Sequence, residues 1–305
     1  MKVLITGGAG FKGVVLAEKL QSIGHQVAVV DTFRWGVQPI VHLANRVEFV
    51  RGDVRHGELM RKLVADKDLV INLAGIVGYP LCERYPKEAH EVNVDSVYTI
   101  LSGMSKKQMF IHASTGSVYG KLEETCTETS STNPLTVYGR TNLESEAPVL
   151  DFGGVVLRFA TAFGVSPCMR FDLLPNFFIW RALNDGFIVL YEADARRTLI
   201  DVKDMARAYL FSADRYQQMK GEIWNVGDES LNVTKREVAK KACDLVGAKL
   251  FVESVGQDKD ARDYEVSYQK IRGIGFQCKH GLEEGLQQIL VVARLVEPDN
   301  AWRIG

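Results

Sequence analysis

The feature that most constrains this chain is a glycine-rich segment close to its N-terminus. A short apolar run at residues 2–6 leads directly into the pattern Gly7-x-x-Gly10-x-x-Gly13, and apolar residues with helical spacing follow at 14–23. Glycines at such a strand–turn–helix junction allow a tight turn and a close approach of backbone N–H groups to a pyrophosphate. The N-terminus of the helix adds partial positive charge. We therefore predict a dinucleotide-binding turn in a Rossmann fold.

The rest of the first half alternates short apolar runs with amphipathic stretches. Strands are expected at 26–30, 47–50, 68–73, 109–113 and 154–159, and a helix at 56–65. Strands separated by helical segments predict βαβ units and a parallel sheet that is covered on both faces. The predicted fold class is α/β, a doubly wound parallel sheet with right-handed crossovers.

The pattern changes after about residue 165. Two strand-like segments, 198–202 and 222–226, are expected to return to the sheet, and helices are expected at 235–246 and 281–295. We therefore predict two domains, the second one smaller and of mixed α/β structure. The dinucleotide-binding Rossmann domain is placed at 1–165 with returns within 198–227, and the substrate-binding domain at 166–197 and 228–305.

Composition excludes several classes of protein. The formal net charge of −1 gives no basic surface for nucleic acid. The cysteine count is odd and no two cysteines form a C-x-x-C pair, which indicates reduced thiols rather than disulfides or a zinc site (Cys82, Cys126, Cys168, Cys243, Cys278). No apolar run approaches the ~18 residues of a membrane span. We expect a cytoplasmic protein with no metal, no membrane contact and no nucleic-acid partner.

Two carboxylates extend the dinucleotide hypothesis. Asp31 ends the second expected strand, where a carboxylate can accept both adenosine ribose hydroxyls and would repel a 2′-phosphate. This favours NAD over NADP, although Arg34 nearby weakens the preference. Asp53 follows the third strand and is either an adenine contact or an ordinary turn carboxylate. Lys12, inside the glycine turn, either extends into solvent, as most lysines do, or contacts the pyrophosphate.

Motifs along most of the chain carry a family resemblance. The segments are the glycine turn, 73–75, 113–120, 134–142, 157–159, 197–206 and 224–227. In this order and spacing they resemble the extended short-chain dehydrogenases/reductases of the NAD-dependent epimerase/dehydratase type. The resemblance implies NAD as cofactor and the following cofactor-binding residues: Gly7, Gly10, Phe11, Lys12, Gly13, Asp31, Asp53, Val54, Leu73, Ala74, Gly75, Ser114, Tyr138 and Asn142.

The resemblance also implies a catalytic set. In this family a tyrosine exchanges the substrate proton, a serine or threonine shares the substrate hydroxyl, and a lysine four residues beyond the tyrosine lowers its pKa. The matching positions are Tyr138, Thr115 and Asn142. A phenol with an ordinary pKa of ~10 is a poor base at neutral pH, and a neighbouring cation favours its phenolate form.

Asn142 departs from the family pattern, because asparagine carries no charge. Three interpretations remain open. The protein is a weakened variant of a Tyr-x-x-x-Lys enzyme, a natural member that uses another cation or the nicotinamide charge alone, or a catalytically silent binder. If the lysine is missed, Asn142→Lys raises turnover, and equal or lower turnover would contradict that idea.

The family resemblance points to a nucleotide-activated sugar as substrate. Its diphosphate requires cations and helix N-termini. The implied substrate-binding residues are Ser117, Arg170, Asn176, Arg197 and Arg262. The segments 74–78 and 163–172 resemble a bacterial surface-polysaccharide subgroup. Dehydratases of the family place an Asp-Glu pair after the catalytic threonine. Gly116 and Ser117 stand there, so dehydration is disfavoured.

The predicted function is that of an NAD-dependent nucleotide-sugar epimerase or C4 dehydrogenase, which begins by oxidising C4 of the sugar. One alternative is an NADP-dependent carbonyl reductase of a non-nucleotide metabolite. Another is a dinucleotide-binding sensor or scaffold without turnover. Family dimers form through helices that correspond to residues 92–104 and 138–150, so a homodimer is expected.

Overall fold

A seven-stranded parallel sheet forms the centre of the molecule. The computed structural model describes residues 1–254 and 263–297. Within them the strand order is β10-β6-β5-β4-β1-β2-β3, with every neighbouring pair parallel. The strands are β1 (Lys2–Thr6), β2 (Gln26–Asp31), β3 (Glu48–Arg51), β4 (Leu69–Asn72), β5 (Met109–Thr115), β6 (Val155–Phe159) and β10 (Ile223–Val226). This confirms the predicted α/β class and the doubly wound Rossmann sheet.

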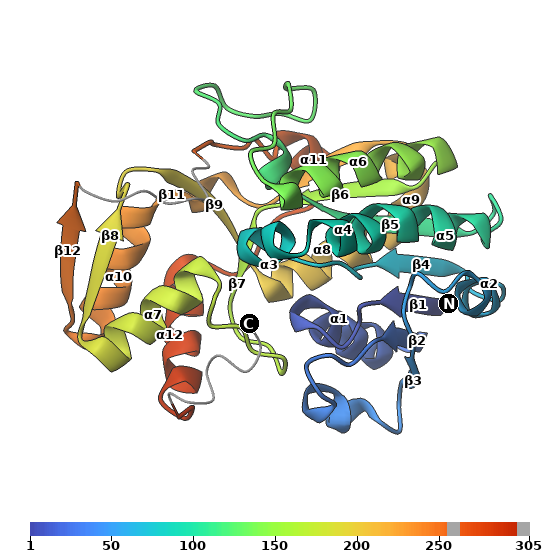
Figure 1. Ribbon diagram of the computed structural model, residues 1–305, viewed down its shortest axis with the longest axis horizontal. Coiled ribbons are helices and arrows are strands. Elements are labelled where there is room, and N and C mark those ends of the chain that lie inside the picture. Colours follow the sequence, from blue (N-terminus) through green and yellow to red (C-terminus); the bar gives the residue numbers. More distant parts are fainter. Residues whose placement is uncertain (255–262, 298–305) are drawn as a thin grey trace.

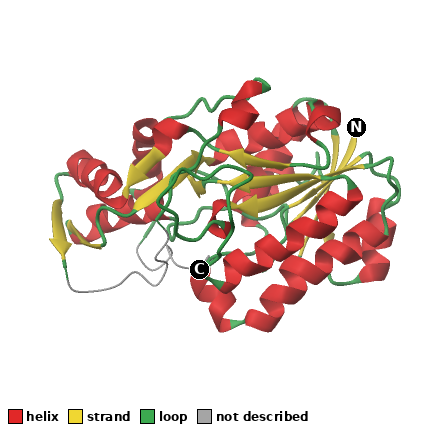
Figure 2. Cartoon of the chain, turned by 90° about the horizontal axis from the view of Figure 1, so that it is seen from above, coloured by secondary structure: helices red, strands yellow, loops and turns green. Residues whose placement is uncertain are grey.

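Helices cover both faces of this sheet (Figure 2). On one face α1 (Phe11–Ser22) packs against α8 (Val202–Asp214). On the other face α6 (Val137–Phe152) packs against α5 (Ser96–Ser102), which in turn contacts α2 (Gly57–Val64). Alternate residues of a strand point to opposite faces, so the residues of β1 divide between two apolar cores.

The prediction that residues 198–202 return to the central sheet is wrong. The corresponding strand, β9 (Arg196–Asp201), pairs in parallel with β7 (Thr161–Phe163) and antiparallel with β11 (Asn232–Thr234). The position beside β6 is occupied by β10, the second of the two expected returns. An apolar strand pattern indicates a buried strand but does not specify its partner.

A separate apolar core lies at the other end of the molecule, on the left in Figure 1. It is built from three helices, α7 (Leu174–Asp185), α10 (Lys235–Val246) and α12 (Leu282–Ala293), and a parallel pair of strands, β8 (Phe187–Tyr191) and β12 (Lys249–Glu253). A capping box between Thr234 and Glu237 starts α10, and left-handed Gly247 ends it.

Shorter elements connect these parts. They are α3 (Tyr79–Arg84), α4 (Pro86–His90), α9 (Tyr216–Met219), α11 (Gln269–Gly273), the 3-10 helices η1 (Gln38–Leu43), η3 (Gly116–Val118) and η4 (Glu229–Leu231), and the π-helix η2 (Glu91–Asp95). Among residues 1–254 and 263–297, no helix combines the length and the apolar character needed to cross a lipid bilayer.

The parallel arrangement brings the predicted site residues to one edge of the sheet. The glycine turn follows β1, Asp31 ends β2, and Thr115 ends β5. Because parallel strands all end at the same edge, these positions share the carboxyl edge, where ligands of such sheets bind.

Candidate active site

Two glycines of the turn are required by the packing of the chain itself. Gly7 has a left-handed backbone, with φ of 67°, and a Cβ there would lie 2.7 Å from the Cα of Ala74. A Cβ on Gly13 would lie 2.5 Å from the Cα of Gly8. A side chain on Gly7 would collide with the backbone that follows β4, and one on Gly13 would push the first turn of α1 away from the glycine turn.

Gly10 differs from these two glycines. Its φ of −82° is open to any residue. A Cβ there would meet, among the described residues, only the carbonyl oxygen of Gly7 at 3.5 Å. No side chain of the described residues caps α1. The first-turn N–H groups of a helix have no intrahelical partners and attract anions. This open space in front of α1 fits the pyrophosphate of a dinucleotide.

The carboxylate of Asp31 is held next to the turn by two backbone groups. Its Oδ2 accepts a hydrogen bond from the N–H of Ala9 at 3.0 Å, and its Oδ1 accepts one from the N–H of Phe33 at 2.8 Å. Each carboxylate oxygen keeps a further lone pair, so Asp31 can still accept two ribose hydroxyls. The guanidinium of Arg34 stacks 5.2 Å from the ring centroid of Trp35.

Asp53, the predicted adenine contact, takes part in an ion-pair network. Its Oδ2 accepts from Nη2 of Arg55 at 2.7 Å, and Nη1 of Arg55 donates to Glu91 at 2.9 Å. The hydrogen bond from Arg55 lowers the pKa of Asp53. Other predicted cofactor residues lie along the same edge of the sheet, Val54 after β3 and Leu73, Ala74 and Gly75 after β4.

The first turn of α6, which carries Tyr138, packs against η3, the turn that follows Thr115. The Oγ1 of Thr115 donates to the Oγ of Ser117 at 3.1 Å and accepts the Ser117 N–H at 3.2 Å. Thr136 caps α6 by accepting from the N–H of Gly139. A Cβ on Gly139 would lie 2.9 Å from the carbonyl oxygen of Ser117. The helix start that carries Tyr138 therefore lies against the turn that follows Thr115.

Asn142 does not replace a lysine electrostatically. Its Nδ2 donates to the backbone carbonyl of Tyr138 at 2.8 Å, and the residue is buried. The side chain supports the first turn of α6 but brings no charge to the phenol. The hydroxyl of Ser114, another predicted cofactor contact, donates to Glu146 at 2.5 Å.

Lys12 is not a solvated surface lysine, so that interpretation is wrong. Its ammonium lies 6.0 Å from the ring centroid of Phe159, and its side chain is largely removed from water. Phe159 is the register partner of Thr115 on the neighbouring strand. Burial, and the positive charge of Arg170, lower the pKa of Lys12 to about 8. Lys12 lies in the first turn of α1, and its ammonium therefore reaches from that turn to Phe159 on β6.

Arg170 interacts electrostatically with both Lys12 and Tyr138. It forms a two-pronged ion pair with Asp172, at 2.9 and 2.5 Å. Burial lowers the pKa of Arg170, but this ion pair and the negative charges of Asp172 and ionised Tyr138 outweigh burial and raise it. Asn176 holds the same loop, since its Nδ2 donates to the carbonyls of Gly164 at 3.0 Å and Arg170 at 2.8 Å.

The structure describes two other predicted substrate residues, Ser117 and Arg197. Ser117 is buried in η3. Arg197 is buried on β9, where its Nη1 donates to the carbonyl of Arg196 at 2.9 Å. Arg262 lies outside the described residues. The described residues contain no cluster of three or more side chains suited to bind a metal ion.

The family follows from a comparison with known proteins. The model of the NAD-dependent epimerase/dehydratase family matches residues 3–227, which is most of the chain. The chain belongs to this family. The resemblance inferred from the motifs is confirmed, and with it the NAD-dependent class of enzyme.

Individual relatives agree with this assignment. The UDP-glucose 4-epimerase 3 of Oryza sativa subsp. japonica is 33% identical over 47% of this chain and 42% of its own length, so that match spans less than half of the relative. A UDP-N-acetyl-alpha-D-glucosaminuronate decarboxylase of Bacillus cytotoxicus is 29% identical over 75% of each chain. The UDP-glucose 4-epimerase of Thermus thermophilus, solved in complex with NAD, is 25% identical with a TM-score of 0.84, covering 96% of this chain and 99% of that one.

The sequence reasoning missed the polar groups that anchor this member's α6 to the sheet. Glu146 and Arg158 form a buried ion pair at 2.7 and 2.9 Å, and each side chain is 4% exposed. Nη1 of Arg158 also donates to the hydroxyl of Tyr119 at 3.1 Å. An arginine inside the otherwise apolar strand β6 was the available signal, because such a charge requires a buried partner.

A second polar chain ties α6 to the neighbouring strands. Asn72 and His112 are joined at 3.1 Å, and the other ring nitrogen of His112 lies 2.9 Å from the hydroxyl of Ser145. Burial, and the charge of Lys12, lower the pKa of His112 to about 3. His112 is therefore a neutral link at physiological pH.

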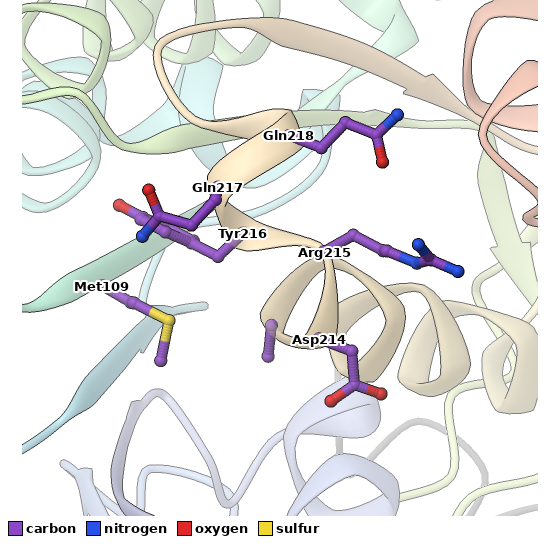
Figure 3. A pocket seen from close by; sticks show the side chains of 7 residues that line it. Met109, Asp214, Arg215, Tyr216, Gln217 and Gln218 are labelled. Carbon is purple, nitrogen blue, oxygen red and sulfur yellow. The ribbon is translucent and has the colours of Figure 1, made fainter.

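One surface hollow lies away from this site (Figure 3). Its lining residues are Met109, Ala213, Asp214, Arg215, Tyr216, Gln217 and Gln218. Met109 begins β5 whereas Thr115 ends it, so the hollow lies at the opposite edge of the sheet. We assign it no part in the family's chemistry.

Proposed function

We propose that this protein is an NAD-dependent nucleotide-sugar epimerase or C4 dehydrogenase. The observation that carries the proposal is the common edge of the sheet. It brings the open pyrophosphate space at Gly10 together with Thr115 and with Tyr138 on the adjoining helix start. Bound NAD supplies the acceptor for the hydride that leaves C4 of the sugar. An NADP-dependent reductase of an unrelated metabolite is not favoured, because the family is NAD-dependent.

In this proposal Tyr138 and Thr115 manage the proton of the C4 hydroxyl. Thr115 holds the hydroxyl oxygen, and the phenol oxygen of Tyr138 takes the proton while the C4 carbon becomes a carbonyl. Ser117 supports Thr115 through the hydroxyl contact at 3.1 Å. An epimerase returns the hydride to the opposite face of C4, whereas a dehydrogenase releases the ketone.

The diphosphate of the sugar requires cations, and we propose Arg170 and Arg197 for this task. Arg262 is proposed from the sequence pattern alone. Both N–H groups of Asn176 are used by backbone carbonyls of its own loop. We therefore propose that Asn176 positions Arg170 for the substrate and donates no hydrogen bond to a phosphate itself.

The decisive experiment is incubation with UDP-, GDP-, dTDP- and CDP-sugars in the presence of NAD, followed by mass spectrometry and NMR. An epimerase gives a product of unchanged mass whose NMR spectrum shows the inverted configuration at C4. A dehydrogenase gives a ketone and one NADH per turnover. Tyr138→Phe removes the proton acceptor and serves as the matched control. Absence of product from every sugar would favour the second candidate, a silent binder, which the neutral Asn142 at the lysine position supports.

Further proposals concern the whole chain. We propose a homodimer through the surfaces of α5 and α6, a cytoplasmic location, and a role in the synthesis of a bacterial surface polysaccharide. We also propose the domain division at residue 165. The core of α7, α10 and α12 is separate from the cores of the sheet, which supports a boundary near residue 165. Tyr264, Tyr268, Ile271 and Phe276, expected in the second domain, instead pack in a core of the sheet.

A further inference from the structure

Position 142 on α6 carries no charge, but the ammonium of Lys12 lies close to the site on another element, α1. Asn142 is neutral and bonded to the backbone of its own helix. We propose that Lys12, from the first turn of α1, supplies the positive charge at the catalytic end of the sheet in place of a lysine at position 142, and that this charge favours reduced over oxidised nicotinamide. The inference deepens the proposed function and rests on it for the roles of Thr115 and Tyr138.

The position of Lys12 carries the first step of the argument. Its backbone belongs to the pyrophosphate-binding turn, but its ammonium lies 6.0 Å from the ring centroid of Phe159 on β6. Phe159 and Thr115 are register partners on adjacent strands. The side chain of Lys12 thus leads from the phosphate end of the site to the residues that handle the substrate proton.

Tyr138 shares the neighbours of Lys12. The ring of Phe159, on which the ammonium lies, is 5.0 Å from the ring of Tyr209. Burial, and the negative charge of ionised Tyr138, raise the pKa of Tyr209 well above its usual value. Arg170 interacts electrostatically with both Lys12 and Tyr138. The ammonium and the phenol therefore lie in one group of side chains.

The described residues around Lys12 provide no ion-pair partner for its charge. His112 on β5 and Tyr209 on α8 are neutral at physiological pH. Burial raises the pKa of Cys168, in the loop after β7, to about 11, so it is a neutral thiol. The carboxylate of Asp172 is paired with Arg170, and the carboxylate of Asp31 accepts backbone N–H groups. In the described part of the chain, no carboxylate forms an ion pair with Lys12.

Electrostatics then gives the direction of the effect. The nicotinamide ring is positive when oxidised and neutral when reduced, and hydride transfer requires it to lie where the substrate proton is handled. A fixed ammonium there repels the oxidised ring more than the reduced ring. With a pKa of about 8, Lys12 is mostly protonated at neutral pH and loses its charge as the pH rises through 8.

The test measures binding and needs no sugar. Dissociation constants for NAD⁺ and NADH are determined by fluorescence, after removal of copurified cofactor, for the wild type, Lys12→Met, Lys12→Arg and the exposed last-turn control Lys19→Met. We expect the preference for NADH to fall about tenfold in Lys12→Met, as for loss of one charge a few ångströms away. Lys12→Arg and Lys19→Met keep the preference, and Asn142→Lys restores it in the Lys12→Met background.

A pH series on the wild type provides an independent measurement. The NADH preference should fall as the pH rises through about 8 in the wild type and stay level in Lys12→Met. An equal NAD⁺ to NADH ratio in wild type and Lys12→Met would overturn the proposal. So would an equal loss of affinity for both forms, which indicates a pyrophosphate contact. A shifted ratio in a protein that converts no sugar refutes the proposed function and leaves the role of Lys12 standing.

Discussion

At Lys12 the preference of a lysine side chain for water conflicts with the burial that the tertiary structure imposes on it. A lysine at this position is expected to reach solvent, but its side chain lies along the sheet edge, over an aromatic ring and near a second cation. Burying a charge without a partner costs stability. Proteins tolerate such conflicts mainly where function requires them. The family fold therefore accommodates a buried charge at position 12.

The first prediction concerns the stability of Lys12→Met. The folded-state pKa of about 8 lies below the usual 10.5, so the unfolded chain binds this proton more tightly. Protonation thus destabilises the fold fully below pH 8, and the penalty disappears as the pH rises towards 10.5. Removing the charge should raise the free energy of unfolding at pH 7 by about 1 to 3 kcal/mol. Urea denaturation should show this gain shrinking between pH 8 and 10.5, and a gain that does not depend on pH would contradict it.

The second prediction separates two glycines of the same turn. Gly10→Ala should fold with near-native stability, because its Cβ has room, but should weaken NAD binding by at least about tenfold because the methyl group occupies the pyrophosphate space. Gly13→Ala should lower the melting temperature, because its Cβ would lie 2.5 Å from Gly8. Thermal unfolding and NAD titration of both variants check this. Equal effects of the two substitutions on stability would contradict the distinction between Gly10, which borders the cofactor, and Gly13, which is required by packing.

At the scale of elements, α6 decides the geometry of the site. Its first turn carries Tyr138 and Asn142, while its middle is bound to β6 through Glu146 and Arg158 and to β5 through Ser145 and His112. These buried bonds fix the rotation of the helix about its axis. The catalytic phenol is thereby placed by residues that never contact the substrate.

The third prediction tests the ion pair that anchors α6. Glu146→Leu leaves Arg158 buried without its carboxylate partner, and Arg158→Met leaves Glu146 buried without its guanidinium partner. Each single variant should lose roughly 3 to 5 kcal/mol of unfolding free energy. The double variant buries two apolar side chains and should cost less than the sum of the single variants. Chemical denaturation of the four proteins gives this comparison. Additive losses would show that the two groups do not stabilise each other.

At the scale of the whole molecule, the two ends of the molecule are built around separate apolar cores. One end is the parallel sheet with its helices, and the other combines α7, α10 and α12 with β8 and β12 (Figure 1). The short strands β7 and β9 pair with each other between these cores. The cofactor residues belong to the first end and Asn176 to the second, so a substrate that bridges them would contact both.

The fourth prediction concerns assembly. Tyr98 on α5 is 56% exposed, which is unusual for a large aromatic side chain and suits a buried place in the proposed dimer. Sedimentation velocity should give about twice the mass of one chain for the wild type. Tyr98→Glu should give monomers, because it would bury a charge in the interface. An exposed control on another helix, Val291→Glu on α12, should leave the dimer intact. A wild-type monomer would refute the proposed assembly.

Local sequence patterns were sufficient to predict the central sheet and most of the candidate site. Apolar periodicity predicted the seven strands of the central sheet, because residues buried on one or two faces recur at regular spacing. It did not predict the shorter strands β7, β8, β11 and β12. The candidate site residues could also be predicted, because each lies at a strand end or a helix start. They are the turn glycines, Asp31 at the end of β2, and the motifs around Thr115 and Tyr138. The missing lysine at position 142 was also evident.

Only the tertiary structure decided what these elements contact. The partner of β9 depended on which edge of the sheet β10 had already filled. The pairing of Glu146 with Arg158 depended on how α6 packs on β6. The place of the Lys12 ammonium, 6.0 Å from the ring centroid of Phe159 on β6, depended on how α1 packs against α8 and the sheet. A sequence pattern specifies which face of an element is buried, whereas long-range packing selects the atoms that meet there.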